Sequence, residues 1–392
     1  MSTGPETQGG VCTACPYCGV GCGVIATPDG QGGAAIAGDP AHPANFGRLC
    51  SKGSALGETI GLEGRLLAPR IGRRDASWEE ATELVAERFR SAIAQHGPDS
   101  IAFYVSGQLL TEDYYVANKL MKGFIGSANI DTNSRLCMAS SVAGHKRAFG
   151  ADTVPGTYED LEEADLVVLV GSNLAWCHPV LFQRLVAAKA ARPGMRVVNI
   201  DPRRTATSAL ADVSLRVAPG SDVALFNALL AAIAEQGAVD AAFVDRHVAG
   251  FADTLAKAQA ETPADVATVT GLDAAEIDAF TRLWIRSEKV VTVYSQGVNQ
   301  SSAGTDKVNA IINCHLATGR IGRPGMGPFS VTGQPNAMGG REVGGLATML
   351  AAHLDIADPD HRAAVQGFWK APAMPEAPGL KAVDLFRACA DG

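Results

Sequence analysis

The sequence predicts a mixed α/β protein in which a small β-rich module precedes doubly wound α/β domains with parallel sheets. From Leu161 onward, β-prone runs, polar turns and helix-forming stretches alternate, which is typical of a parallel sheet covered by helices on both faces. Near the N-terminus, several cysteines lie among turn-forming residues instead. With 392 residues, 47% of them hydrophobic, the chain is long enough for several packed domains.

Composition narrows the functional classes. The net charge is −8 and no basic stripe is present, which argues against nucleic-acid binding. Nine cysteines, several of them clustered, indicate a reducing compartment rather than a disulfide scaffold. The N-terminal MSTGPETQGG has no apolar core or twin-arginine signal, and the longest apolar run, Ala224 to Ala234, is too short to span a bilayer. We therefore expect a cytoplasmic protein with no membrane partner.

The cysteine spacing near the N-terminus predicts a metal centre. Cys15, Cys18 and Cys22 follow a C-x2-C-x3-C pattern, and Cys50 comes after a long gap. Three thiolates on one tight loop and one distant thiolate can surround a cubane, and four thiolates are the usual ligands of a 4Fe–4S cluster. Three glycines let the loop turn sharply and approach inorganic sulfur: Gly19, Gly21 and Gly23.

Two other interpretations of these cysteines are a set of buried structural thiols and a zinc site. Such clustering of structural thiols is improbable by chance. Zinc sites usually combine two short C-x2-C motifs. Here three cysteines lie close together in the sequence and the fourth is far away. The pattern therefore favours iron and sulfur, and Cys12, which is off the spacing, is expected to be a bystander.

The first third of the chain predicts four elements. A hairpin runs from Cys22 to Ile36 around Pro28-Asp29-Gly30, and its module ends near Leu56. Ser77 and Glu80 form a capping box that opens an amphipathic helix. Its predicted apolar face consists of Trp78, Ala81, Leu84, Val85, Phe89 and Ile93. A strand over Ile101 to Val105, ending at Ser106-Gly107-Gln108, and a helix over Thr111 to Phe124 follow.

The α/β part predicts three strands, each followed by a helix. The strands are Asp165 to Val170, Arg196 to Ile200 and Lys289 to Tyr294. The helices are Pro179 to Ala191, Val223 to Glu235 and Lys307 to Thr318, with a last short helix over Ala382 to Ala390. Cys314 and Cys389 fall on apolar helix faces and are expected in the core.

The turns after the predicted strands indicate a ligand site, because ligands of parallel sheets bind at the carboxyl ends of strands. These turns carry Gly171, Ser172, Asn173, Asp201, Arg203 and Arg204. Glycine allows close approach, arginines and helix N-termini suit a pyrophosphate, and a carboxylate suits a ribose or a base edge. Each residue alone is equally typical of an ordinary turn. No G-x-G-x-x-G follows either of the first two strands, so an ordinary NAD fingerprint is absent.

A glycine-rich segment, Gly325 to Gly345, has two interpretations of equal weight. Its composition suits a flexible surface loop, but glycine-rich loops also pass close to ligands, and this one contains Gln334, Asn336 and Arg341.

The segment 133–141, NSRLCMASS, together with the cysteine set, resembles the molybdopterin-dependent oxidoreductases of the dimethylsulfoxide-reductase superfamily. Within them the chain is most similar to the family of assimilatory nitrate reductase catalytic subunits. The resemblance covers the whole chain and rests on several motifs in the same order: CSKG, NSRLCMASS, YEDLEEADLVVLVGSNLAWCHP, the DPR turn and TGQPNAMGGREVG.

The resemblance implies a role for each matching residue. Cys15, Cys18, Cys22 and Cys50 would hold the 4Fe–4S cluster. Cys137 would ligate molybdenum beside two molybdopterin guanine dinucleotides, and a soft thiolate suits a metal already bound by sulfur. Lys52 would conduct electrons between cluster and pterin, although without the family it is an ordinary surface lysine. The implied cofactor contacts are Lys52, Gln108, Asn133, Gly171, Ser172, Asn173, Cys177, Asp201, Arg203, Gly220, Ser221, Asp222, Gln296, Gly297 and Gln334.

The activity implied by the resemblance is reduction of nitrate to nitrite by oxygen-atom transfer, with electrons entering through the cluster. Arg341 is the expected anchor for nitrate, a planar anion that suits a guanidinium, and Met138 would shape the pocket. Cys177 and His178 look like a ligand pair, but we interpret them as part of the nucleotide loop. The donor would be an NADH-linked flavoprotein, ferredoxin or flavodoxin.

Two rival activities remain. Formate dehydrogenases typically have His after the metal-ligating residue and an Arg-Gly-Gln-Asn-Asn run, where this chain has Met138 and Thr332. A non-catalytic iron–sulfur scaffold, like the related subunit of respiratory NADH dehydrogenase, is disfavoured by the intact Cys137.

The resemblance also implies a domain division, because members of the family are far longer. We expect an iron–sulfur domain over 1–60 and a partial α/β domain formed by 61–137 with 331–392. A molybdopterin-guanine-dinucleotide domain would occupy 138–330. The C-terminal half, with its second cofactor-binding domain, is expected to lie outside this sequence.

Overall fold

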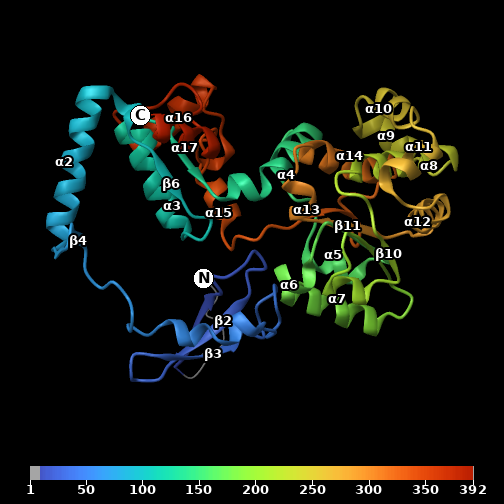
Figure 1. Ribbon diagram of the computed structural model, residues 1–392, viewed down its shortest axis with the longest axis horizontal. Coiled ribbons are helices and arrows are strands. Elements are labelled where there is room, and N and C mark those ends of the chain that lie inside the picture. The colour runs from blue at the N-terminus through green and yellow to red at the C-terminus, as the bar shows by residue number, and fades with distance from the viewer. Residues whose placement is uncertain (1–8, 392) are drawn as a thin grey trace.

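The computed structural model describes residues 9–391, so most of the polar segment MSTGPETQGG lies outside the described residues. The chain begins with a three-stranded antiparallel sheet of β1 (Val11–Ala14), β2 (Gly23–Pro28) and β3 (Ala34–Gly38). Two short helices follow, α1 (Ser51–Ser54) and η1 (Leu56–Thr59). The predicted hairpin is therefore confirmed as β2 and β3, and β1 was not predicted. This module lies beside α6 and α7 of the large sheet domain (Figure 1).

A small hairpin, β4 (Arg70–Ile71) with β5 (Arg74–Asp75), leads to α2 (Trp78–His96). The predicted capping box is present: Ser77 Oγ accepts from Glu80 N at 3.2 Å, and Ser77 N donates to Glu80 Oε2 at 2.9 Å. The predicted apolar face is covered only at its C-terminal end, where Phe89 and Ile93 pack on a small core. Trp78 stays 69% exposed, so the helix is correct and its expected burial is not.

A second, small α/β unit contains two parallel strands, β6 (Phe103–Val105) and β7 (Ile130–Thr132). Its helices are η2 (Pro98–Ser100), α3 (Thr111–Asn118), the π-helical turn η3 (Lys119–Ile125), α15 (Ala337–Glu342), η5 (Ala351–His353), α16 (Pro359–Trp369) and α17 (Ala382–Asp391). Residues from 98–132 and 337–391 thus lie together although they are distant in sequence (Figure 1).

The main sheet has five parallel strands in the order β10-β9-β8-β11-β12. They are β8 (Leu166–Val170), β9 (Arg196–Ile200), β10 (Val213–Leu215), β11 (Val290–Tyr294) and β12 (Gly327–Ser330). The chain moves outward from β8 to β10 and then returns to place β11 on the other side of β8. The strand order therefore reverses between β8 and β11, which is where doubly wound sheets bind ligands.

Alternate side chains of these strands pack on opposite faces. On one face, Leu166, Val168 and Val170 meet α8 (Asp222–Glu235), α12 (Ala274–Arg286) and α14 (Gly304–Ala317). On the other, Val167 and Leu169 meet α5 (Tyr158–Glu163), α6 (Leu174–Cys177) and α7 (Pro179–Ala191), together with the cysteine module. The predicted helices on both faces are confirmed. The remaining elements are η4 (Ala206–Leu210), α9 (Ala241–His247), α10 (Phe251–Ala258), α11 (Pro263–Thr270) and α13 (Gln296–Asn299).

In the C-terminal third the structure decides one open interpretation and corrects one expectation. The glycine-rich segment contains β12 and α15, with Gly340 and Arg341 buried, so it is structured rather than a flexible surface loop. Cys314 is buried as predicted, whereas Cys389 is exposed because it lies one turn beyond Leu385, near the end of α17, where the helix buries no side chain.

One long helix connects the two α/β units. α4 (Ser134–Phe149) starts just after β7 and packs against α14 of the main sheet (Figure 1). The predicted domain boundary between 137 and 138 falls inside its first turn. Within residues 9–391, no helix combines the length and apolarity that crossing a membrane requires.

Candidate functional site

The four cysteines of the predicted cluster line one apolar void. Cys15 N donates a hydrogen bond to Cys22 O at 2.8 Å, and Cys50 is the residue just before α1. The other lining residues are Tyr17, Val20, Leu49, Gly53, Pro179 and Val180. Among residues 9–391, no three His, Cys, Asp or Glu side chains are arranged to hold a single metal ion.

Burial raises the pKa of Cys15 and Cys18 and raises that of Cys22 to about 12, with neighbouring thiolates adding to the effect. Four thiolates would therefore coexist here only with positive charge between them. An iron–sulfur cluster supplies that charge and takes four thiolates, so this donor set fits the group.

Lys52 is an exposed residue of α1 whose charge acts on a thiol of each site. Its ammonium opposes the burial that raises the pKa of both Cys18, which lines the void, and Cys177, which lines the cavity. The role of Lys52 between cluster and pterin stays a prediction.

Cys137 lies in the first turn of α4 and is 6% exposed. Gln296 Nε2 and Thr332 Oγ1 each lie 3.7 Å from its sulfur. Met138, Val142 and Ala337 form the apolar side of its surroundings. The thiol thus lies where α4, the end of β11 and the segment after β12 meet.

A cavity of about 650 Å³ opens at the carboxyl ends of β8, β9 and β11. It is lined by Gly171, Asn173, Cys177, Ile200, Asp201, Pro202, Arg203, Val217, Ala218, Pro219, Gly220, Asp222, Gln296, Gly297, Gln300, Ser301 and Lys307. Nine of the predicted cofactor contacts are in this lining. The volume, the glycines and the switch-point position fit a pyrophosphate-linked cofactor.

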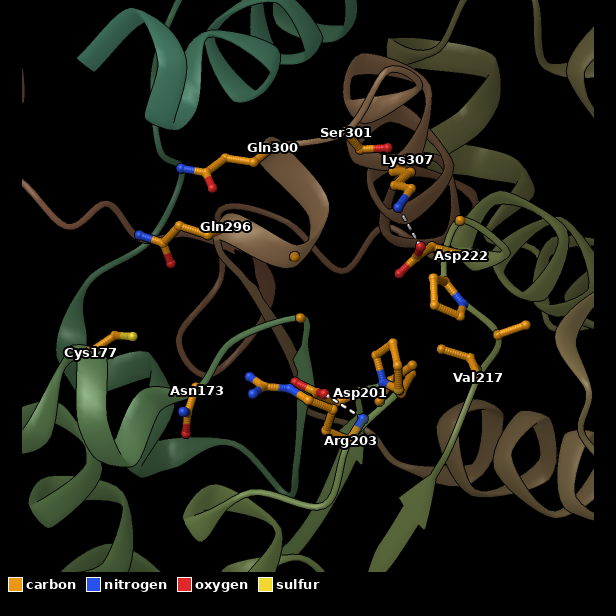
Figure 2. Close-up of a pocket in the computed structure, with 17 residues that line it drawn as sticks. Asn173, Cys177, Asp201, Arg203, Val217, Asp222, Gln296, Gln300, Ser301 and Lys307 are labelled. Atoms are coloured by element: carbon orange, nitrogen blue, oxygen red, sulfur yellow. Dashed lines mark hydrogen bonds and ion pairs between the residues drawn. The ribbon is translucent and has the colours of Figure 1, made fainter. Parts of the chain in front are cut away.

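Charged groups lie on two sides of the cavity (Figure 2). Asp201 Oδ1 accepts from the Arg203 backbone N at 2.8 Å, which fixes the turn after β9. Opposite, Lys307 Nζ pairs with Asp222 Oδ2 at 2.7 Å, and both side chains are buried. Prediction from sequence missed Gln300, Ser301 and Lys307, because no motif marks them and only folding brings α14 to this edge.

Six predicted contacts lie outside the cavity lining, and one of them is Lys52. Asn133 Oδ1 accepts from Gly107 N at 2.8 Å where β6 and β7 end, and Gln334 packs against Gly107. Both are therefore on the Cys137 side, in the smaller α/β unit, where Gln108 is exposed in the turn after β6. The last two are buried: Ser172 follows β8, and Ser221 is the residue just before α8.

Arg341 is buried on α15 and pairs with a buried carboxylate. Its Nη1 lies 2.5 Å from Asp152 Oδ2, while its buried Nε has no hydrogen-bond partner among the described residues. His145 lies next to Asp152, with its Nδ1 4.0 Å from Asp152 Oδ1. Arg341 Nη2 donates to Met338 Sδ at 2.7 Å, so both terminal nitrogens of the guanidinium already have partners. The role of Arg341 as nitrate anchor stays a prediction.

The chain matches two family models. The one described as Molybdopterin oxidoreductase matches residues 65–390, and the one described as Molybdopterin oxidoreductase Fe4S4 domain matches residues 8–61. The chain is 58% identical over 380 residues to a protein named nitrate reductase from Klebsiella oxytoca, covering 97% of this chain and 43% of that protein. It is 49% identical over 390 residues to another of that name from Shewanella frigidimarina, covering 97% and 41%. The chain therefore spans less than half the length of these relatives.

Among solved structures, acetylene hydratase from Pelobacter acetylenicus superposes with a TM-score of 0.70 at 23% sequence identity. The superposition covers 78% of this chain and 42% of that one. At that identity the likeness supports the fold alone.

Proposed function

We propose that this chain, which belongs to the molybdopterin oxidoreductase family, is part of an enzyme that reduces nitrate to nitrite. The observation that carries the proposal is the position of Cys137. Its thiol lies beside Gln296, which lines the dinucleotide cavity, and beside Thr332, which adjoins the cysteine loop. The proposed metal ligand thus lies next to a residue that lines the cavity and next to a residue that adjoins the four-cysteine site. The names of the relatives at 58% and 49% identity supply the substrate.

The cofactor in this proposal is molybdenum held by molybdopterin in its guanine dinucleotide form. Support for the dinucleotide comes from the size of the cavity and from the two acids that line it, Asp201 and Asp222. Carboxylates suit the donor edge of guanine, and the glycine contact at the switch point suits a pyrophosphate.

When bound, the molybdenum centre would supply the oxygen-atom abstraction by which nitrate, two electrons and two protons give nitrite and water. The protein positions the reactants and controls charge. Cys137 would supply one thiolate, and Gln296 Nε2 donates toward that sulfur. Met138 and Val142 keep this side of the thiol apolar. Lys52 would offset negative charge between cluster and pterin.

The assignment is tested with holoenzyme that contains this chain, using reduced viologen as donor. Nitrate-dependent viologen oxidation with stoichiometric nitrite is expected, and formate should not reduce the enzyme. Formate oxidation would instead support the dehydrogenase alternative. We further propose an assimilatory role in the cytoplasm with a flavoprotein, ferredoxin or flavodoxin as donor. Cell fractionation and donor-dependent nitrite formation test those two points.

A further inference from the structure

The loop that holds three cluster cysteines directly touches the segment beside the metal-ligating thiol. Gly19 lies between Cys18 and Cys22, and its backbone N donates to Gly333 O at 3.1 Å. A Cβ atom at Gly19 would overlap the carbonyl oxygen of Thr332 and come within 3.2 Å of Gln334 O. Only glycine therefore allows these two backbones to approach this closely.

Thr332 is held in place from several directions. Its carbonyl oxygen accepts from His178 Nε2 at 2.6 Å, and its hydroxyl donates to Gln334 Oε1 at 2.8 Å. Burial lowers the pKa of His178, which keeps the ring neutral with its hydrogen on the nitrogen that faces the carbonyl. Since His178 is itself buried at the start of α7, Thr332 is tied to the main α/β domain.

The same threonine faces the thiol on its other side. Its Oγ1 lies 3.7 Å from Cys137 Sγ. One residue thus contacts the cysteine loop through its carbonyl group and Cys137 through its side chain. The cysteine loop is further anchored by Tyr158, whose hydroxyl donates to Val20 O at 3.1 Å.

We propose that Thr332 is a positioning residue that sets the separation between the four-cysteine site and Cys137. The proposal rests on the proposed function, because it assumes that electrons pass between groups bound at these two sites. In this arrangement the protein, and not the intervening cofactor alone, fixes the distance that the electrons cross. Gly19 is required because it lets the cysteine loop sit against the Thr332 carbonyl.

The test compares holoenzyme containing Gly19→Ala with wild type. The methyl group should push the cysteine loop away from Thr332. In dithionite-reduced samples without nitrate, the magnetic interaction between cluster and molybdenum, which falls steeply with separation, should weaken. Nitrate turnover with reduced viologen should fall roughly tenfold or more, in line with displacements near 1 Å at reacting groups.

A matched control is Gly57→Ala. Its Cβ would overlap a backbone carbonyl in the same module, that of Ala34, far along the chain from Thr332. Iron and molybdenum contents are measured for both variants. If Gly57→Ala weakens the interaction as much as Gly19→Ala does, the Thr332 contact has no special role and the proposal is wrong.

A second pair of variants keeps the test decisive should Gly19→Ala misfold. Thr332→Val keeps the carbonyl contact and removes the hydroxyl beside Cys137, so it should alter the magnetic interaction, and Thr332→Ser should restore it. An unchanged interaction in Thr332→Val at full metal content would overturn the proposal. Since these spectra need no substrate, an enzyme inactive toward nitrate would refute the proposed function while leaving this inference testable.

Discussion

Gly171 and Gly297 lie against each other where β8 and β11 leave the sheet. Gly297 N donates to Gly171 O at 2.9 Å, and a Cβ on Gly297 would come within 2.6 Å of the Gly171 Cα. The two strand ends that flank the reversal in strand order are therefore in backbone contact at the edge of the cavity. Any residue other than glycine at either position would displace the backbone that lines the cavity.

Replacing Gly297 with alanine should destabilise the chain by about 1–3 kcal/mol, the usual cost of forcing a methyl group into a packed region. Urea unfolding of residues 1–392 measures this. Gly194→Ala is the control, because its Cβ would meet nothing within 4 Å. Equal stability of the two variants would show that the Gly171 contact is easily relaxed.

The buried His145 should make stability depend on pH. Burial lowers the pKa of His145 to about 4, with Arg341 adding to the effect and Asp152 opposing it. Below about pH 6.5 this histidine is protonated in the unfolded chain but stays neutral in the folded chain. The free energy of unfolding therefore falls as the pH drops from about 6.5 to 4. The expected loss from this ring is roughly 3 kcal/mol.

Urea unfolding at several pH values tests this expectation. His145→Gln should show a shallower loss below pH 6.5 than wild type. The remaining slope comes partly from His315, whose pKa burial lowers to about 3. Identical pH profiles for variant and wild type would show that His145 is protonated without penalty in the folded chain.

Lys52→Ala in the holoenzyme should slow nitrate turnover while iron and molybdenum contents stay at wild-type levels. Arginine keeps the charge but not the compact ammonium, so Lys52→Arg should recover only part of the rate. The surface substitution Lys257→Ala is the control. An unaltered rate of nitrate turnover in Lys52→Ala would show that this lysine has no role in electron transfer.

Variants of Arg341 and Asp152 can show whether Arg341 binds nitrate or only stabilises the fold. Asp152→Asn removes the charge that pairs with the guanidinium and leaves Arg341 freer to bind an anion. If Arg341 binds nitrate, Asp152→Asn should lower the KM for nitrate and Arg341→Lys, which loses the bidentate fork, should raise it. If the pair is only structural, both variants lower the unfolding midpoint and neither moves KM.

Local patterns in the sequence were sufficient for the individual elements. The bounds of Pro179–Ala191 and Arg196–Ile200 are those predicted, because each has clear periodicity and a defined turn at its end. The cysteine spacing likewise predicted which four thiols share one void. Composition left two interpretations open for 325–345, because tertiary contacts decide between them: the glycines there serve close packing, as Gly340 does against Tyr114, rather than flexibility.

Long-range contacts at the site could not be predicted in this way. Lys307 reaches Asp222 and Thr332 reaches Gly19 only because the order of the strands brings their segments to one edge. The pairing of Arg341 with Asp152 crosses 189 positions of sequence. No periodicity or motif spacing carries information about such pairs, whereas the resemblance of whole motifs indicated their neighbourhood.

In the proposed electron route, a cluster held by Cys15, Cys18, Cys22 and Cys50 supplies electrons to nitrate through a centre bound by Cys137. The most direct measurement follows the electron paramagnetic resonance signal of the reduced cluster in anaerobic holoenzyme before and after nitrate is added. We expect a cluster signal that nitrate abolishes as nitrite forms in the wild type and that persists in Cys137→Ala. Stoichiometric zinc in place of iron, or a wild-type signal that survives nitrate, would contradict it.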